Sequence, residues 1–422
     1  MLALLSLASA ADVREPLTAL VSPLLEEDRI GVLVVAVIAD GEVRTLTFGA
    51  RSEGVDKNTG FEIGSVSKAF TGLLLAEAVR RGEVALTDPV SKHVSSPIPT
   101  WEGTEITLLD LATHTSGLPR LPADFAPTDP RDPYAHLTWT QVEQSLAKTV
   151  LDAKPGESYL YSNLGAALLG HALEQAGGKP YAELLAERVV DPLHLESTDV
   201  DGVAVLQGHD ADGVAVPAWS LGPYAPAGGI HSTARDLTRV AAALLKPEGD
   251  IGTSIALATQ SHRSLGDQGS LGLFWHRTPE GAVWHNGQTG GFHALVAAAP
   301  ARNIAVVALG DTATDFVDRV GFAALELAAG QSPARLPVRR TREVSATDAK
   351  PLAGRYGPAE VVFEADALWL ALPDQPRRRL WPAADCADCW FLRDVPAQLT
   401  FDGNRLVLEQ EGARRQEWRR RN

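Results

Sequence analysis

The chain has 422 residues, of which 45% are hydrophobic and 22% charged, and its formal net charge is −15. This composition is typical of a globular protein with a sizeable core and excludes a largely disordered chain. The excess of acidic residues disfavours contact with phosphate backbones, so we predict no nucleic-acid partner.

The N-terminus is a short apolar run that ends in Ala8-Ser9-Ala10. This small-x-small pattern is typical of a signal-peptide cleavage site, although the usual positively charged start is missing. We therefore predict that residues 1–11 are a signal peptide with a truncated start and that the protein is periplasmic or secreted. An apolar first helical turn is the alternative. No apolar run approaches the length that spans a bilayer, so we predict no transmembrane anchor.

Residues 12–331 alternate between blocks of strand and helix patterns. The first block is an amphipathic stretch followed by two β-branched runs, 30–38 and 42–48, that Asp40-Gly41 joins as a hairpin. A helix that is apolar on most sides follows at 65–82, and a proline-rich loop occupies 118–133. Further helix patterns lie at 140–151, 164–176, 181–190, 237–245 and 316–329, and strand patterns at 282–285, 292–299 and 304–309. This order predicts an α+β domain in which helices flank an antiparallel sheet and a helical insertion divides that sheet in sequence.

The last part of the chain differs in character from the rest. Residues 332–349 are rich in Pro, Arg, Thr and Ser and are predicted to be a linker. Residues 350–422 alternate short strands and turns, which predicts a small all-β, barrel-like domain. Cys386 and Cys389 are the only cysteines. They fit a local loop disulfide or two spare thiols better than a zinc site, because a second ligand pair is missing.

The first pattern that carries chemistry is Ser65-Val66-Ser67-Lys68 at the predicted helix start. Positions three apart lie on one helix face, so Lys68 can reach the Ser65 hydroxyl. A serine needs a base to become nucleophilic, and a lysine serves if burial disfavours its charged form. The same spacing recurs at Ser145 and Lys148 inside a helix pattern, and we interpret that copy as solvated.

Two further patterns follow in the chain. Tyr161-Ser162-Asn163 offers a proton shuttle, if cations lower the tyrosine pKa, and an amide that binds both a carbonyl and an amine. His285-Asn286-Gly287 follows a strand pattern, and its glycine lets a peptide-like substrate approach the strand edge. Taken alone, the Tyr161 pattern is better explained as a turn and helix cap, and the His285 pattern as a glycine-rich hairpin.

Together the three patterns resemble the serine β-lactamase and penicillin-binding-protein superfamily, and specifically its class C branch. The family's motifs are S-x-x-K, Y-x-N and [K/H]-x-G, in that order. The stretches Phe61–Gly64, Leu111–Pro119 and Ala227–Asp236 also resemble the family, and the likeness spans about residues 12–330. This resemblance implies the serine β-lactamase-like fold. The predicted β domain at residues 350–422 is consistent with the resemblance, because some family peptidases carry a C-terminal β-barrel.

The resemblance implies a role for each catalytic residue. Ser65 would attack a carbonyl and form an acyl-enzyme that water then releases. Lys68 and Tyr161 would share the general-base and general-acid work, and Asn163 would orient Lys68 and the substrate amide. No metal or cofactor is implied, and no metal-binding motif is present in the sequence.

The third motif supplies the remaining predicted residues. The backbone N–H of Gln288, with that of the nucleophile, would form the oxyanion hole, and Gly287 and Thr289 would bind substrate. His285 is predicted to be catalytic, but class C β-lactamases typically carry lysine there. A histidine is mostly neutral at pH 7, and this pattern is associated with D-peptidases and esterases.

The sequence therefore predicts a serine hydrolase that acts on an amide or ester bond of a small-molecule or peptide substrate. A D-peptidase or carboxylesterase is favoured over a true β-lactamase. The alternatives are a sensor that β-lactams acylate without turnover and an inert scaffold of the same fold. The oligomeric state and the exact substrate are not predicted.

Overall fold

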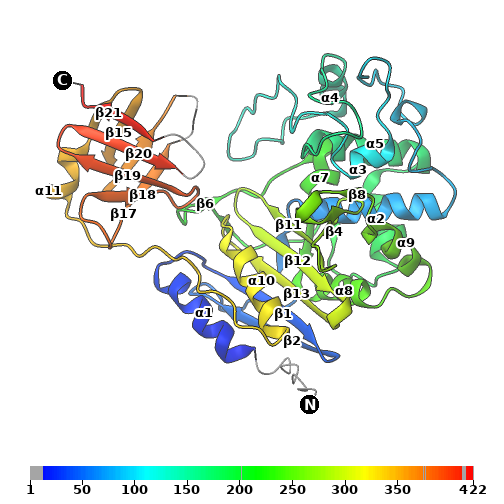
Figure 1. Cartoon of the computed structure of the whole chain (residues 1–422), viewed down its shortest axis with the longest axis horizontal. Helices are drawn as coiled ribbons and strands as arrows, with labels where there is room; N and C mark the ends of the chain where they lie inside the picture. The colour runs from blue at the N-terminus through cyan, green and yellow to red at the C-terminus, as the bar shows by residue number, and fades with distance from the viewer. Residues whose placement is uncertain (1–12, 201, 374, 376, 411–414, 422) are drawn as a thin grey trace. The chain divides into compact units, whose positions relative to one another are not determined.

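The computed structural model describes residues 13–421, apart from 201, 374, 376 and 411–414. The predicted signal peptide, residues 1–11, lies outside this part of the chain. The described residues form two compact units, which Figure 1 colours along the chain. Unit 1 comprises residues 13–22, 30–210 and 215–335, and unit 2 comprises 23–29, 211–214 and 336–421.

An eight-stranded antiparallel sheet organises unit 1 (Figure 1). The hairpin from the start of the unit pairs directly with the strands from its end, in the order β2-β1-β13-β12-β11-β10-β9-β8. Asp40 and Gly41 turn the first hairpin with φ angles of 53° and 77°, the conformation that two-residue hairpins favour. The strands are β1 Leu33–Ala39, β2 Glu42–Phe48, β8 Arg263–Ser264, β9 Ser270–Leu271, β10 His276–Arg277, β11 Val283–Gln288, β12 His293–Ala299 and β13 Ile304–Gly310.

Helices cover both faces of this sheet, because alternate residues along a strand point to opposite sides. Helix α10 (Phe316–Ala328) packs on one face, where Gly321 lies against Leu295 and Ala308. The other face joins the buried residues of α2 (Val66–Arg80) and α8 (Ala234–Leu245) in one continuous hydrophobic core. Central strands β1 and β13 are buried throughout, as expected for strands covered on both sides.

The helical insertion separates two short strands that pair with each other, β3 (Gly60–Glu62) and β7 (Ile230–Thr233). Helix α2 is the first helix of this insertion. It is buried on nearly every side, as its apolar sequence predicted. The predicted α+β fold is confirmed. Helix α1 (Arg14–Glu26) begins in unit 1, and its residues 23–26 belong to unit 2. The remaining helices of unit 1 are α3 Leu108–Ala112, α4 Trp139–Leu146, α5 Asn163–Gly177, α6 Tyr181–Leu185, α7 Ala225–Gly228 and α9 Gly249–Thr259, with a π-helical turn at Ala186–Val190 and short strands β4 Asp199–Val200, β5 Gly208–His209 and β6 Ala215–Val216.

Unit 2 contains the predicted barrel-like β structure. Its eight strands pair antiparallel in simple chain order, and a bridge between Tyr356 and Arg420 brings the first and last edges together. Its own core centres on buried side chains such as Leu368, Leu399 and Leu406. The strands are β14 Gly354–Tyr356, β15 Ala359–Glu364, β16 Ala367–Ala371, β17 Arg378–Pro382, β18 Cys389–Phe391, β19 Ala397–Asp402, β20 Arg405–Gln410 and β21 Gln416–Arg419.

Two local features settle points that the sequence left open. Cys386 and Cys389 form a disulfide, which is the local loop pairing rather than two free thiols. The segment 332–349 is not uniformly irregular, because helix α11 (Ala346–Ala349) occupies its end. Within the described part of the chain, no helix combines the length and apolar character needed to cross a membrane.

Candidate active site

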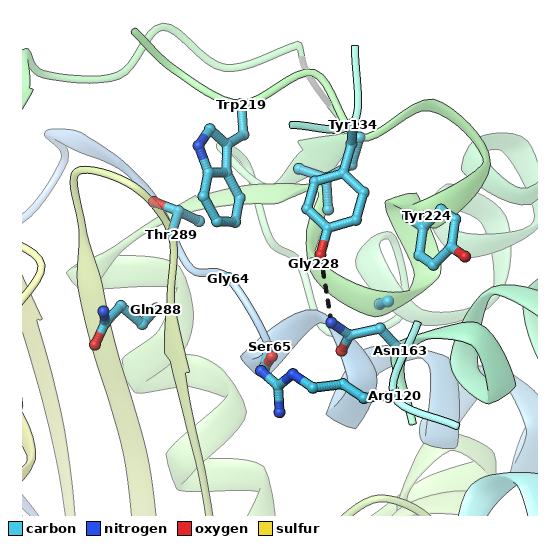
Figure 2. Close-up of a pocket in the computed structure, with 12 residues that line it drawn as sticks. Gly64, Ser65, Arg120, Tyr134, Asn163, Trp219, Tyr224, Gly228, Gln288 and Thr289 are labelled. Atoms are coloured by element: carbon cyan, nitrogen blue, oxygen red, sulfur yellow. Dashed lines mark hydrogen bonds between the residues drawn. The ribbon is translucent and has the colours of Figure 1, made fainter. Parts of the chain in front are cut away.

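Ser65 stands immediately before the first residue of α2, at the bottom of a cavity that Figure 2 shows. Its backbone is already helical, with φ −63° and ψ −9°. The preceding Gly64 has φ +50°, in the left-handed region that glycine adopts without strain. This Gly-Ser junction turns the chain sharply from β3 into the buried helix.

Strand β11 approaches the Ser65 turn so closely that two glycines are required. A Cβ built at Gly287 would lie 2.1 Å from the Ile63 carbonyl oxygen and 2.5 Å from the Ser65 backbone nitrogen. A Cβ built at Gly64 would lie 2.7 Å from the Gln288 backbone nitrogen. The backbones of Ser65 and Gln288 therefore face each other directly. The backbone nitrogens of the two predicted oxyanion-hole residues therefore lie on facing segments of the chain.

Two side chains converge on the Ser65 hydroxyl oxygen. Lys68 Nζ lies 2.9 Å from Ser65 Oγ and also donates to the Ala227 carbonyl oxygen at 2.6 Å. The Tyr161 hydroxyl donates to Ser65 Oγ at 2.8 Å. Lys68 and Tyr161 are themselves close, with the ammonium nitrogen 4.9 Å from the centre of the phenol ring. The serine is thus in hydrogen-bond contact with one basic and one acidic group.

Burial sets the protonation of both partners. Lys68 is 0% exposed, and desolvation, followed by the charge of Arg120, lowers its pKa well below the usual value. A neutral amine, which can accept the serine proton, is therefore favoured. Burial also raises the pKa of Tyr161 to about 12. Desolvation outweighs the opposing effects of the Ser65 hydrogen bond and the Arg120 charge on this pKa. Tyr161 stays protonated.

His114 holds the tyrosine motif in position. Its Nδ1 accepts the backbone N–H of Ser162 at 3.1 Å, and its ring lies 4.3 Å from the Tyr161 ring. The Ser162 hydroxyl caps α5 by accepting the Gly165 N–H. His114 is 1% exposed, and burial lowers its pKa well below 6.5. These contacts are those of a structural histidine.

The cavity above Ser65 measures about 340 Å³. Three aromatic side chains form much of its wall: Tyr134, Trp219 and Tyr224 (Figure 2). Phe125 does not line it but packs behind Tyr134, with ring centres 5.4 Å apart. The cavity is of the size and aromatic character that suit a small ligand or the end of a peptide.

The family model described as beta-lactamase matches residues 17–330. The chain belongs to the beta-lactamase family. A curated beta-lactamase of Pseudomonas fluorescens is 29% identical, over 74% of this chain and 97% of that protein. The D-alanyl-D-alanine-carboxypeptidase/endopeptidase AmpH of Escherichia coli K12 is 32% identical, over 57% of this chain and 68% of that protein.

Two solved structures share the fold of this beta-lactamase family member. The octameric penicillin-binding protein homologue of Pyrococcus abyssi has a TM-score of 0.66 at 23% identity, covering 97% of this chain and all (100%) of that chain. A class C beta lactamase also has a TM-score of 0.66, at 21% identity, covering 76% of this chain and 99% of that chain. The sequence resemblance to this superfamily is confirmed.

Asn163, the last residue of the family's second motif, lines the cavity (Figure 2). Its amide nitrogen donates to the Tyr134 hydroxyl at 3.5 Å, and its buried amide oxygen has no hydrogen-bond partner among the described residues. The predicted contact with Lys68 is not observed there, because Lys68 donates to Ala227 instead. An open acceptor that faces the cavity suits a substrate N–H.

The residues of the family's third motif lie in two places: His285 is in the core, and Gln288, which follows the motif, lines the cavity. His285 is 1% exposed and does not line the cavity, and burial lowers its pKa well below 6.5. Gln288 lines the cavity through its backbone; Figure 2 shows its side chain turned away from Ser65. Its amide oxygen instead lies 3.0 Å from His293 Nδ1. His285 is therefore neutral and gives no fixed positive charge.

Thr289 lines the cavity, but its hydroxyl is already engaged. It donates to Glu62 Oε2 at 2.5 Å, and Glu62 Oε1 accepts the Trp219 backbone N–H at 2.6 Å. Glu62 is 2% exposed, and desolvation raises its pKa. This buried carboxyl group ties the aromatic wall of the cavity to the end of β11. No sequence pattern indicated this contact, the hydrogen bond from Lys68 to the Ala227 carbonyl, or the place of Arg120 in the cavity lining.

Proposed function

We propose that this protein is a hydrolase that cleaves amide or ester bonds through an acyl-enzyme on Ser65. The observation that carries this proposal is the hydrogen-bonded trio of Ser65, Lys68 and Tyr161, in which the lysine is fully buried. A buried, neutral amine beside a serine hydroxyl is the arrangement that makes the hydroxyl nucleophilic. Two backbone N–H groups next to that serine suit the charge that forms on the substrate oxygen.

In the proposed acylation, Lys68 takes the Ser65 proton while Oγ attacks the substrate carbonyl carbon. The negative charge on the carbonyl oxygen is stabilised by the N–H groups of Ser65 and Gln288. Tyr161, which is protonated, gives its proton to the leaving nitrogen or oxygen as that bond breaks, and Lys68 returns a proton to the phenolate. Water then repeats the sequence on the acyl-enzyme, releasing the acid and restoring Ser65.

We further propose that the substrates are D-configured peptides or small acyl esters rather than β-lactams. His285 replaces the lysine typical of class C β-lactamases, and its burial keeps it neutral. One relative is named a D-alanyl-D-alanine-carboxypeptidase/endopeptidase, which favours peptide chemistry, while others are named beta-lactamases. The aromatic cavity accommodates a short acyl group or one amino-acid side chain.

Three chromogenic or assayable substrates test this proposal: a p-nitrophenyl ester, an N-acylated D-alanyl-D-alanine and a chromogenic cephalosporin. Steady-state kcat/KM is measured for each with wild type and with Ser65→Ala. We expect turnover of the ester or the D-dipeptide to exceed that of the cephalosporin, and the variant to be inactive. Faster hydrolysis of the cephalosporin would contradict the substrate assignment and indicate a β-lactamase.

The second candidate is a binding protein that β-lactams acylate without release. It uses the same Ser65, Lys68 and Tyr161 chemistry, and it differs only in how water reaches the acyl-enzyme. Rapid-mixing kinetics separate the two. A burst equal to the protein concentration with no later turnover, for every substrate, would replace the hydrolase by this candidate.

We also propose that the protein is exported, on the basis of the Ala8-Ser9-Ala10 pattern. The mass of the mature protein purified from the native host tests this. A product that begins after Ala10 or Ala11 is expected, and retention of Met1 would contradict export.

A further inference from the structure

Arg120 brings a guanidinium group into the catalytic cavity without an acidic partner. The side chain lines the cavity with Ser65 and Asn163 (Figure 2) and lies 5.1 Å from the centre of the Tyr161 ring. Its backbone carbonyl accepts the Asn163 N–H at 3.0 Å, which fixes the loop at the start of α5. Across the described residues, no carboxylate lies within ion-pair distance of this guanidinium.

The chain has 53 acidic and 38 basic residues, so acidic partners outnumber the basic side chains. The absence of an ion pair at Arg120 among the described residues is unexpected for that reason. On the same loop, Arg131 is ion-paired to Asp129 at 2.9 Å. Arg120 therefore keeps its donors available for a ligand. A guanidinium presents them as a planar fork that matches a carboxylate in bidentate geometry.

The opposite wall offers nothing equivalent. His285 is buried, neutral and outside the cavity lining. The Thr289 hydroxyl donates to Glu62 Oε2 at 2.5 Å, so it has no proton left for a substrate carboxylate. Glu62, behind that threonine, would repel such a group to the extent that it is ionised. An anionic substrate therefore finds its positive charge on the Tyr161 side of the cavity.

We propose that Arg120 binds a carboxylate on the leaving-group side of the substrate. The proposal rests on the proposed function, because Tyr161 is the group that protonates the leaving atom and Arg120 stacks on its ring. The substrate class is then an acylated D-amino acid or hydroxy acid with a free C-terminal carboxylate, one residue beyond the scissile bond. Amidated and esterified analogues lack the recognised group.

The kinetic test uses two thioesters with the same scissile bond, N-acetyl-D-alanyl-thioglycolate and its methyl ester. The first carries a free carboxylate on the leaving group and the second does not, and a thiol reagent follows both reactions. We expect Arg120→Gln to raise the ratio of the KM for the acid to the KM for the methyl ester by about tenfold, the scale of a charge-assisted contact. Any effect of Arg120 on the Lys68 pKa acts on both substrates alike and cancels in this ratio. Arg120→Lys should restore part of the preference.

The matched control is Arg131→Gln, which removes the same charge from the same loop at a position outside the cavity lining. It should leave the ratio of the two kcat/KM values at the wild-type level. Equal losses for acid and ester in Arg120→Gln would overturn the proposal, because they would show that Arg120 acts on the Tyr161 and Lys68 chemistry instead. Unchanged rates for both would overturn it as well.

A binding measurement decides the point without any turnover. Ser65→Ala is titrated with N-acetyl-D-alanyl-D-alanine and with its C-terminal amide, using isothermal titration calorimetry. We expect the acid to bind about tenfold tighter than the amide, and Ser65→Ala/Arg120→Gln to lose that difference. Equal binding of the two ligands, or no binding of the acid, would overturn the role of Arg120. Failure of the proposed hydrolase would appear separately, as wild type that cleaves neither thioester.

Discussion

The chain carries the spacing Ser-x-x-Lys twice in unit 1, and the two copies have opposite surroundings. Lys68 is 0% exposed and lies 2.9 Å from Ser65 Oγ. In the second copy the Lys148 side chain is 74% exposed and lies 3.8 Å from the carboxylate of Asp124. The Ser145 hydroxyl donates to that same carboxylate at 2.7 Å rather than meeting its lysine.

The difference shows that the motif alone creates no nucleophile. Both copies have helical spacing, but only the first begins a helix that is buried on nearly all sides. Burial lowers the pKa of Lys68, whereas the Lys148 side chain is exposed to water and lies beside the Asp124 carboxylate. Ser65 can lose its proton to a neutral amine, and Ser145 faces only a carboxylate that accepts its hydrogen bond.

The sharpest way to break this comparison is to remove each lysine in turn. Lys68→Met keeps the side-chain length and removes the base, so kcat/KM for a neutral ester should fall by roughly a thousandfold or more, within the range of general-base catalysis. Lys148→Met should leave kcat/KM within about twofold, because a surface ion pair contributes little. Thermal unfolding of both variants checks that the fold is kept. A comparable loss in the two variants would remove the distinction between the copies.

A second comparison concerns two tyrosines of one loop. Tyr161→Phe removes the hydroxyl that donates to Ser65, so the acylation rate should fall at least about a hundredfold. Tyr159→Phe is the matched control, because Tyr159 packs edge-on against His114 and does not line the cavity. Stopped-flow measurement of the acylation burst checks both. A near-normal burst in Tyr161→Phe would show that the proton is donated by another group.

The third prediction concerns pH and has the smallest effect. Acylation needs neutral Lys68, and the neutral fraction grows as pH rises through the lysine pKa. Since burial lowers that pKa well below 10.5, kcat/KM should rise and level off well before an ordinary lysine would titrate. Tyr161, with a pKa raised to about 12, should add no falling limb over the measured range.

Profiles of kcat/KM for a neutral ester from about pH 5 to 10 report the groups of the free enzyme. In Arg120→Gln the rising limb should move to higher pH, because the charge of Arg120 contributes to the lowering of the Lys68 pKa. A wild-type rate that still climbs steeply at the alkaline end would mean that Lys68 has an ordinary pKa.

Much of the fold could be predicted because the patterns are strong. Three patterns each indicate a single secondary structure: the Asp40-Gly41 turn of the first hairpin, the apolar sequence of α2 and the alternating strand patterns of unit 2. Helix α9 (Gly249–Thr259) was not predicted. Its sequence begins with glycine and contains Gly252, Thr253 and Ser254, which are weak helix formers, and the tertiary packing of residues such as Ile255 overrides that preference.

The grouping of Ser65, Lys68 and Tyr161 could also be predicted, because helical spacing brings Ser65 and Lys68 together and the tyrosine motif follows them in the family's order. The remaining contacts depend on backbone approaches that no local pattern encodes. Lys68 donates to the carbonyl of Ala227, 159 positions away in the sequence. The protonation of Tyr161 and His285 depends on burial that only the assembled core creates.

The most direct test of the central claim is intact-mass spectrometry after treatment with a fluorophosphonate, which labels activated serines. Wild type, Ser65→Ala and Ser145→Ala are compared. The account predicts one adduct on wild type and on Ser145→Ala, and none on Ser65→Ala. An adduct that persists in Ser65→Ala, or its absence from wild type, would contradict the claim that burial at the start of α2 activates Ser65.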